Sequence, residues 1–222
     1  MKTMRLKYIL LFAAFFFTAK IFAQSGFPYD NEIRDFKHQD SLSFPKKDGI
    51  LFIGSSSFRL WSDLEQRFAS KPIIKRGVGG CELSNIVNFY TPYILFPYHP
   101  RKIFIYAGEN DIAYGHSADS VLVNFKKLYR MIRTKLPDAK IYYLSIKPSP
   151  SRVKYHDDDL RANAQIRAYI KGKRNCKYLD MNESIYKPGT TQPDSSLFKP
   201  DYLHLNSKGY DRWQKILEPY VK

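Results

Sequence analysis

The sequence has few cysteines: Cys81 and Cys176 are the only two among 222 residues. Two cysteines allow at most one disulfide, which excludes the disulfide framework of small secreted domains. Whether the two thiols meet, or are two separate buried side chains, stays open. Zinc-finger spacing, internal repeats and low-complexity linkers are also absent. These absences exclude a zinc-finger or repeat protein and favour a single domain.

Acidic residues are outnumbered, with 21 Asp and Glu against 36 Lys and Arg and a formal net charge of +15. The basic residues are scattered, and no basic helix with heptads is present, so the pattern does not indicate a nucleic-acid partner. A basic surface is more typical of a protein that lies near anionic envelope polymers or lipids. With 44% hydrophobic and 26% charged residues, the composition is that of a folded globular protein.

The N-terminus combines basic residues with a long apolar run. Lys2, Arg5 and Lys7 precede the apolar residues 8–17, a pattern typical of a secretory signal peptide. We expect residues 1–23 to be cleaved, which leaves 32 basic and 21 acidic residues, and the protein to be exported, periplasmic or secreted. The alternative is an uncleaved anchor, but the run is shorter than the roughly 20 apolar residues of a spanning helix. Stable membrane insertion is therefore not expected after cleavage.

Apolar strand-like runs then alternate with amphipathic segments. Strands are expected at residues 49–53, 72–75, 102–106, 140–145 and 176–180. Helices are expected at 61–68, 82–90, 122–136 and 157–171, and after a cap at Asn206 or Ser207. The expected buried positions are Leu122, Phe125, Tyr129, Ile132 and Leu136 in one helix and Tyr210, Trp213, Leu217 and Tyr220 in the last. This alternation predicts the α/β class: a doubly wound three-layer α/β/α sandwich with a mainly parallel five-stranded sheet.

Two segments allow both a structural and a functional interpretation. Asp157, Asp158 and Asp159 have side chains that bind metals, but a helix N-terminus explains three consecutive acids better. The aromatic segment 89–98 offers a surface for a sugar or an acyl chain. Aromatic side chains are more often core, and we favour that interpretation.

Glycine and polar residues follow the first three expected strands, in residues 54–57, 77–80 and 108–111. In a parallel sheet these loops start at one edge, where ligand sites form. Near the C-terminus, Asp201 precedes His204 by three residues, a spacing that allows both to belong to a hydrolytic triad with a serine. Helix capping is the alternative explanation for the serines.

These four blocks, in this order between Ile50 and His204, resemble those of the SGNH hydrolases, also called GDSL esterases. The resemblance implies a flavodoxin-like fold and a catalytic triad of Ser56, Asp201 and His204. The choice of Ser56 among three adjacent serines rests on its position in the sequence motif of the family. The resemblance also implies an oxyanion hole formed by the backbone N–H groups of Ser56 and Gly80 and the side-chain amide of Asn110.

The expected protein is therefore a signal peptide, residues 1–23, followed by a hydrolase domain, residues 24–222. The resemblance implies a serine esterase that cleaves carboxylic esters through an acyl-enzyme, with no cofactor and no metal. The partner is a small-molecule or glycan ester, and removal of acetyl groups from a carbohydrate is the first expectation. The alternatives are a lysophospholipase, a thioesterase and a non-catalytic module that binds the envelope.

Overall fold

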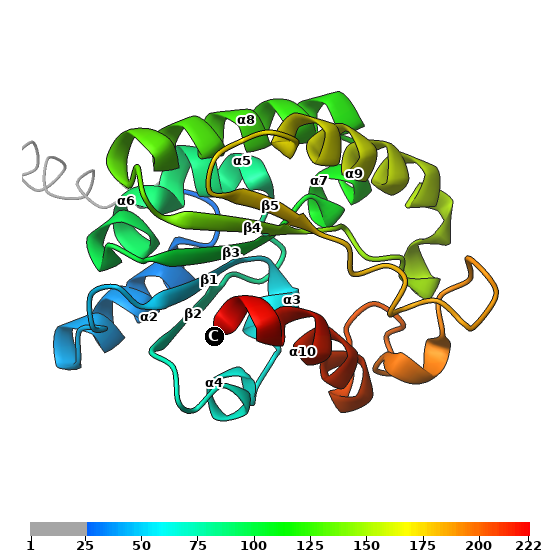
Figure 1. The fold of residues 1–222 in the computed structure, drawn as a ribbon, viewed down its shortest axis with the longest axis horizontal. Coiled ribbons are helices and arrows are strands. Elements are labelled where there is room, and N and C mark those ends of the chain that lie inside the picture. The colour runs from blue at the N-terminus through cyan, green and yellow to red at the C-terminus, as the bar shows by residue number, and fades with distance from the viewer. Residues whose placement is uncertain (1–25) are drawn as a thin grey trace, which may run out of the picture.

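A computed structural model describes residues 26–222, arranged as helices around a central sheet (Figure 1). The expected signal peptide lies outside the described residues, so its cleavage stays a prediction. Within residues 26–222, no helix has the length and apolar character needed to cross a membrane. The strands are β1 Ile50–Gly54, β2 Ile73–Gly77, β3 Lys102–Tyr106, β4 Lys140–Leu144 and β5 Cys176–Leu179.

Four long helices and several short ones surround the strands. The long helices are α2 Asp30–Leu42, α8 Ala118–Lys135, α9 His156–Ile170 and α10 Ser207–Val221. The short helices are α3 Ser56–Arg59, α4 Leu64–Arg67, α5 Leu83–Asn85, α6 Thr91–Ile94 and α7 Glu109–Ala113. A π-helical turn, η2 Ile86–Tyr90, and three 3-10 turns, η3 Phe96–Tyr98, η4 Pro150–Tyr155 and η5 Ser195–Leu197, complete the described elements.

All neighbouring strands run parallel, in the order β2-β1-β3-β4-β5. The predicted fold class is confirmed: a three-layer α/β/α sandwich around a five-stranded sheet. At its carboxyl end, Gly54 of β1 pairs with Gly77 of β2 and with Tyr106 of β3. Because these strands end level with one another, the loops that follow them start at one edge of the sheet.

Both faces of the sheet are buried. Leu51 and Ile53 of β1 belong to the core cluster under α8 and α9, whereas Phe52 belongs to the cluster under α3 and α10, the two helical layers seen in Figure 1. On the second side the ring of Phe52 stacks on Phe104 with 4.6 Å between centroids. Burial on both faces explains why these strands are continuous apolar runs in the sequence.

The predicted helix over residues 61–68 is wrong. Only Leu64–Arg67 form a helical turn, α4, and Trp61 lies in the turn before it. Trp61, Leu64 and Phe68 still share one core cluster, because the turns bring them together as a helix face would. Helix α2 is not predicted by the sequence, since Ile33 is its buried residue and the segment lacks an apolar period.

Helix α8 begins four residues before the first predicted position, after Ser117, whose side chain caps it. Phe125, Ile132 and Leu136 are buried as predicted, whereas Leu122 and Tyr129 are only partly buried. The centre of the buried face contains Val121 and Leu128 instead of the predicted Leu122 and Tyr129. The helix is therefore rotated slightly from the predicted face.

The last helix, α10, has the predicted buried residues Tyr210, Trp213 and Leu217, while Tyr220 is only partly buried. Of the two expected caps, Asn206 is the one observed: its side-chain oxygen accepts a hydrogen bond in the first turn at 3.2 Å. This cap fixes where the helix begins, directly after the loop that carries the predicted aspartate and histidine.

Candidate active site

The turn after β1 contains three consecutive serines, and geometry distinguishes one of them. Gly54 has φ +152°, and a Cβ there would lie 2.0 Å from a carbonyl oxygen of β3, so the turn requires glycine. Ser55 and Ser57 are buried, whereas Ser56 is partly exposed. The Oγ of Ser56 lies 2.9 Å from Nε2 of His204. The serine that contacts the histidine is thus the one that the sequence motif of the family indicates.

Helix capping does not account for these serines. Ser55 occupies the N-cap position of α3 but makes no side-chain capping hydrogen bond within the described residues. Helix α3 has four residues, so the helix dipole expected at Ser56 is small. The C-terminal helix stabilises the serine turn, because the hydroxyl of Tyr210 in α10 donates a hydrogen bond to the Ser57 carbonyl at 2.8 Å.

Asp201 and His204 share the loop before α10. Oδ2 of Asp201 lies 2.7 Å from Nδ1 of His204, and Oδ1 accepts the backbone N–H groups of Leu203 and His204, both at 2.9 Å. Burial disfavours the charged carboxylate, but the hydrogen bonds from His204 and Leu203 outweigh it and lower the pKa of Asp201 to about 2. The carboxylate is therefore ionised at neutral pH and fixed against the imidazole.

Gly80 lies in the loop after β2 with φ +73°, in the left-handed region that favours glycine. A Cβ there would lie 2.8 Å from the hydroxyl of Tyr29, which donates a hydrogen bond to the Gly80 carbonyl at 3.2 Å. Among residues 26–222, the backbone N–H groups of Gly80 and Ser56 donate to no protein acceptor. Both donors are free to bind a ligand oxygen.

Asn110, which follows β3, is 5% exposed and has both ends of its amide engaged. Nδ2 donates a hydrogen bond to the Cys81 carbonyl at 3.0 Å, and Oδ1 accepts one from each terminal nitrogen of Arg152, both at 3.1 Å. A side-chain amide nitrogen carries two hydrogens, so one Nδ2 hydrogen remains for a ligand. The sequence gives no signal that points to Arg152, because it lies 42 residues from Asn110.

A buried cluster of charged and polar groups lies behind Asn110. Glu109 accepts hydrogen bonds from Lys147 Nζ at 2.9 and 3.1 Å, from Ser149 Oγ at 2.9 Å and from the Tyr106 hydroxyl at 2.7 Å. Burial opposes ionisation of Glu109, but the charges of Lys147 and Arg152 hold its pKa below the ordinary value. The cluster fixes the backbone next to Asn110, and sequence reasoning missed it.

The other candidates take structural places. Asp157, Asp158 and Asp159 form the first turn of α9, as the helix interpretation predicts. Cys81 is buried with its Sγ 3.2 Å from the Gly54 carbonyl, and Cys176 is half-buried. Both cysteines are free thiols, so the disulfide that the sequence leaves open is not formed.

The aromatic segment 89–98 is mainly core, in agreement with the favoured interpretation. Tyr90 and Tyr98 are fully buried. Tyr93 is 38% exposed, and its ring stacks on Phe27 with 5.8 Å between centroids. The segment therefore packs the helical layer and leaves one ring at the surface.

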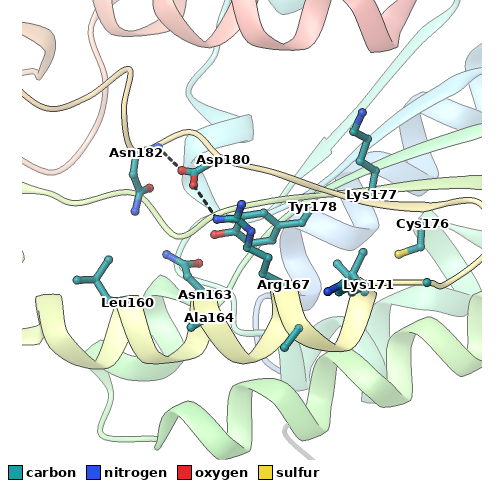
Figure 2. Close-up of a pocket in the computed structure, with 13 residues that line it drawn as sticks. Leu160, Asn163, Ala164, Arg167, Lys171, Cys176, Lys177, Tyr178, Asp180 and Asn182 are labelled. Atoms are coloured by element: carbon teal, nitrogen blue, oxygen red, sulfur yellow. Dashed lines mark hydrogen bonds and ion pairs between the residues drawn. The ribbon is translucent and has the colours of Figure 1, made fainter.

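A hollow of about 610 Å³ lies between α9 and the edge strand β5 (Figure 2). Figure 2 shows Arg167 reaching across it toward Asp180, with which it pairs at 3.8 Å. None of the predicted site residues lines this hollow. It is separate from the serine, histidine and aspartate group.

Comparison with known proteins identifies the family of the chain. Residues 40–212 match the model of the GDSL-like Lipase/Acylhydrolase family. The platelet-activating factor acetylhydrolase IB subunit alpha1 of Bos taurus is 25% identical over 173 residues, which cover 74% of this chain and 71% of the relative. The resemblance to the SGNH hydrolases is thereby confirmed.

Solved structures share the fold. A Streptococcus pneumonia protein, described provisionally as a platelet activating factor, matches with a TM-score of 0.76 and 20% identity, covering 98% of this chain and 99% of that one. A family 3 carbohydrate esterase from Talaromyces cellulolyticus matches with a TM-score of 0.61 and 15% identity, covering 78% and 95% of the two chains. The chain belongs to the GDSL-like lipase/acylhydrolase family and is a carboxylic ester hydrolase.

Proposed function

We propose that the protein is an exported serine esterase that removes short acyl groups, acetyl groups in particular, from a carbohydrate. The observation that carries the mechanism is the line of hydrogen bonds from Ser56 Oγ through His204 to Asp201, at 2.9 and 2.7 Å. It joins a hydroxyl, an imidazole and an ionised carboxylate in the order that nucleophilic catalysis requires. In this proposal Ser56 is the nucleophile, His204 the base and Asp201 the group that orients it.

The first half of the reaction forms an acyl-enzyme. Asp201 accepts the Nδ1 hydrogen of His204, which leaves the Nε2 lone pair directed at the Ser56 hydroxyl. Nε2 takes the hydroxyl proton as Oγ bonds to the ester carbonyl carbon, and the carbonyl oxygen becomes negative. The N–H groups of Ser56 and Gly80 and the free Nδ2 hydrogen of Asn110 stabilise that oxygen. One such donor contributes about 3 kcal/mol to transition-state stabilisation.

The first half ends when His204 gives its proton to the alcohol oxygen, the ester bond breaks and the acyl group stays on Ser56. The second half returns the enzyme to its starting state. A water then attacks the acyl carbon while His204 accepts one of its protons. The carboxylic acid leaves, and the proton returns to the Oγ of Ser56.

The choice of an acetylated carbohydrate has separate support. The Bos taurus relative is named an acetylhydrolase, and one similar structure is a carbohydrate esterase. The basic residues and apolar run at the N-terminus support export, and the excess of 32 basic over 21 acidic residues in the chain after residue 23 suits an anionic polymer. Acyl groups on lipids and thioesters are the competing substrates.

Substitution of adjacent serines tests the mechanism. Ser56→Ala should abolish hydrolysis of p-nitrophenyl acetate and labelling by a fluorophosphonate. Ser57→Ala, which removes a buried hydroxyl that has no partner among the described residues, is the matched control and should keep both. Labelling of Ser56→Ala at the wild-type level would contradict the assignment. A wild-type protein that neither turns over nor labels would support the non-catalytic module.

A panel of acetylated sugars, lysophospholipids and acyl thioesters tests the substrate class. We expect the highest kcat/KM for an acetylated sugar. A higher value for either of the other two classes would overturn that choice.

The intact mass of the exported protein tests the signal peptide, and a mature chain that retains Met1 would contradict it.

A further inference from the structure

A second hollow, of about 420 Å³, is lined in part by Arg152, which contacts Asn110 of the candidate active site at 3.1 Å. It is formed by the turn before α9, residues 148–156, and by residues 187–195, which lie near each other at one end of the molecule in Figure 1. Its lining residues are Pro148, Ser149, Pro150, Arg152, Val153, His156, Lys187, Thr191, Gln192, Pro193 and Ser195. We refer to it as the β4 hollow, because the first of these segments follows β4.

The ionisable side chains that line the β4 hollow are basic. They are Arg152, His156 and Lys187, and among residues 26–222 no aspartate or glutamate lines it. Two carboxylates near the hollow are engaged by other groups: Glu109, 3.8 Å from Arg152, accepts hydrogen bonds from buried Lys147, and Asp194 accepts those of the Ser196 N–H and hydroxyl at 3.0 and 2.7 Å. The hollow therefore favours a negatively charged ligand.

The walls also offer apolar surface and hydrogen-bonding groups. Pro148, Pro150 and Pro193 contribute rigid apolar faces, and Val153 is 62% exposed beside them. The backbone N–H of Lys187 donates a hydrogen bond to the Gln192 carbonyl at 2.8 Å, which closes the loop that carries Lys187. A ring or carbon skeleton that bears an anionic group matches this combination.

Arg152 connects the β4 hollow with the candidate oxyanion hole. Its guanidinium has five N–H donors. Two of them donate to Asn110 and one to the Glu109 carbonyl, and within residues 26–222 no hydrogen bond uses the others. The next residue toward the N-terminus, Ser151, binds the Tyr202 carbonyl through its N–H and its hydroxyl at 3.1 and 3.0 Å. Hydrogen bonds of Arg152 and Ser151 thus connect the turn beside the hollow with Asn110 and with the loop that carries Asp201 and His204.

We propose that the β4 hollow binds an anionic group, a carboxylate or a phosphate, on the alcohol portion of the ester, through Lys187, His156 and the free edge of Arg152. This inference rests on the proposed function, since it takes Ser56 as the position of the ester carbonyl. It narrows the substrate class to acidic carbohydrates, such as an acetylated uronic acid or an acetylated sugar phosphate.

Matched esters test the proposal. The kcat/KM values are measured for an acetylated methyl glucoside, the corresponding acetylated glucuronide and the corresponding 6-phosphate. We expect wild type to prefer one anionic ester over the neutral one, and Lys187→Gln to reduce that ratio about tenfold. The carboxylate and phosphate arms identify which anion is recognised. Lys127→Gln, an exposed lysine on α8, is the matched control and should leave the ratio unchanged.

A binding measurement separates failure of this inference from failure of the proposed function. Ser56→Ala protein is titrated with methyl glucuronide and with inorganic phosphate by calorimetry, which requires no turnover. We expect one of them to bind, with at least tenfold weaker binding when Lys187→Gln is added. Hydrolysis without any preference for an anionic ester, or the absence of binding by both probes, would overturn the anion site and leave the esterase mechanism intact.

Discussion

The guanidinium of Arg152 holds the amide oxygen of Asn110 between its two terminal nitrogens, each at 3.1 Å. This contact decides which way the amide faces, because an oxygen held by two donors leaves the Nδ2 hydrogens on the opposite side. One of them reaches the Cys81 carbonyl at 3.0 Å. Arg152 is therefore a positioning residue for the donor that the mechanism assigns to Asn110.

Arg152→Lys should lower kcat for p-nitrophenyl acetate about tenfold while KM changes less than about twofold. A lysine keeps the charge but lacks the planar fork that holds the amide. Arg152→Met, which removes the charge and the donors, should lower kcat further. Steady-state kinetics on both variants checks this order. Wild-type kcat in both variants would show that the contact has no part in positioning.

Asn110→Ala should lower kcat by about 10² to 10³, since one oxyanion donor is lost. Asn110→Asp should be equally impaired, because an ionised carboxylate of similar shape offers no donor. Asn163→Ala is the control: that amide is also buried, and within residues 26–222 its side chain hydrogen-bonds the backbone of Ile146 alone. It should reduce stability but keep the kcat of the folded protein. A kcat for Asn110→Ala within about threefold of wild type would remove Asn110 from the oxyanion hole.

Lys147→Met should lower the free energy of unfolding by about 3 to 5 kcal/mol, because it leaves Glu109 charged and buried. The double variant Glu109→Gln, Lys147→Met should lose less than the sum of the two single variants. Urea denaturation of the four proteins gives the coupling energy. Arg161→Met removes an exposed ion pair with Asp158, at 3.2 Å, and should cost less than about 1 kcal/mol. Additive losses at the buried pair would contradict this prediction.

Asp159 gives the protein a stability that falls as pH rises. It is 4% exposed, and burial, followed by the charge of Glu109, raises its pKa from 3.8 to about 8. The folded state keeps a proton that the unfolded state loses, so this stability is complete below about pH 4 and is lost by about pH 8. Tm should therefore be higher at pH 5 than at pH 8.

Asp159→Asn should remove most of that difference, because the amide is neutral at both pH values. Asp157→Asn, in the exposed part of the same turn, is the control and should keep the difference. Calorimetric unfolding at the two pH values compares the three proteins. An unchanged pH dependence in Asp159→Asn would assign the effect to another group.

The sequence predicted the strands and the loops between them well. The strand at residues 102–106 is observed with the predicted ends, because a run buried on both faces stands out between polar turns. Glycine and polar residues at the strand ends also marked the loops that carry Ser56, Gly80 and Asn110, and the apolar runs predicted that these loops start at one edge of the sheet. The choice of these three residues within the loops rested on the resemblance to the family.

The sequence did not predict what depends on contacts between distant segments. Arg152, Glu109 and Lys147 look like ordinary charged residues until the fold brings the turn after β4 against the loop after β3. The expected helix over residues 61–68 failed for a related reason. The spacing of apolar residues indicates that Trp61 and Phe68 are buried together, but it does not distinguish a helix from a series of turns.

The Tyr210 hydroxyl that binds the Ser57 carbonyl has a consequence for biosynthesis. Ser56 and His204 are 148 residues apart, so in the proposed mechanism the nucleophile is translated long before its base. The C-terminal segment would supply both that base and the hydroxyl that secures the serine turn. On this mechanism, a nascent chain that lacks the segment has no esterase activity, and activity begins only when the last helix docks.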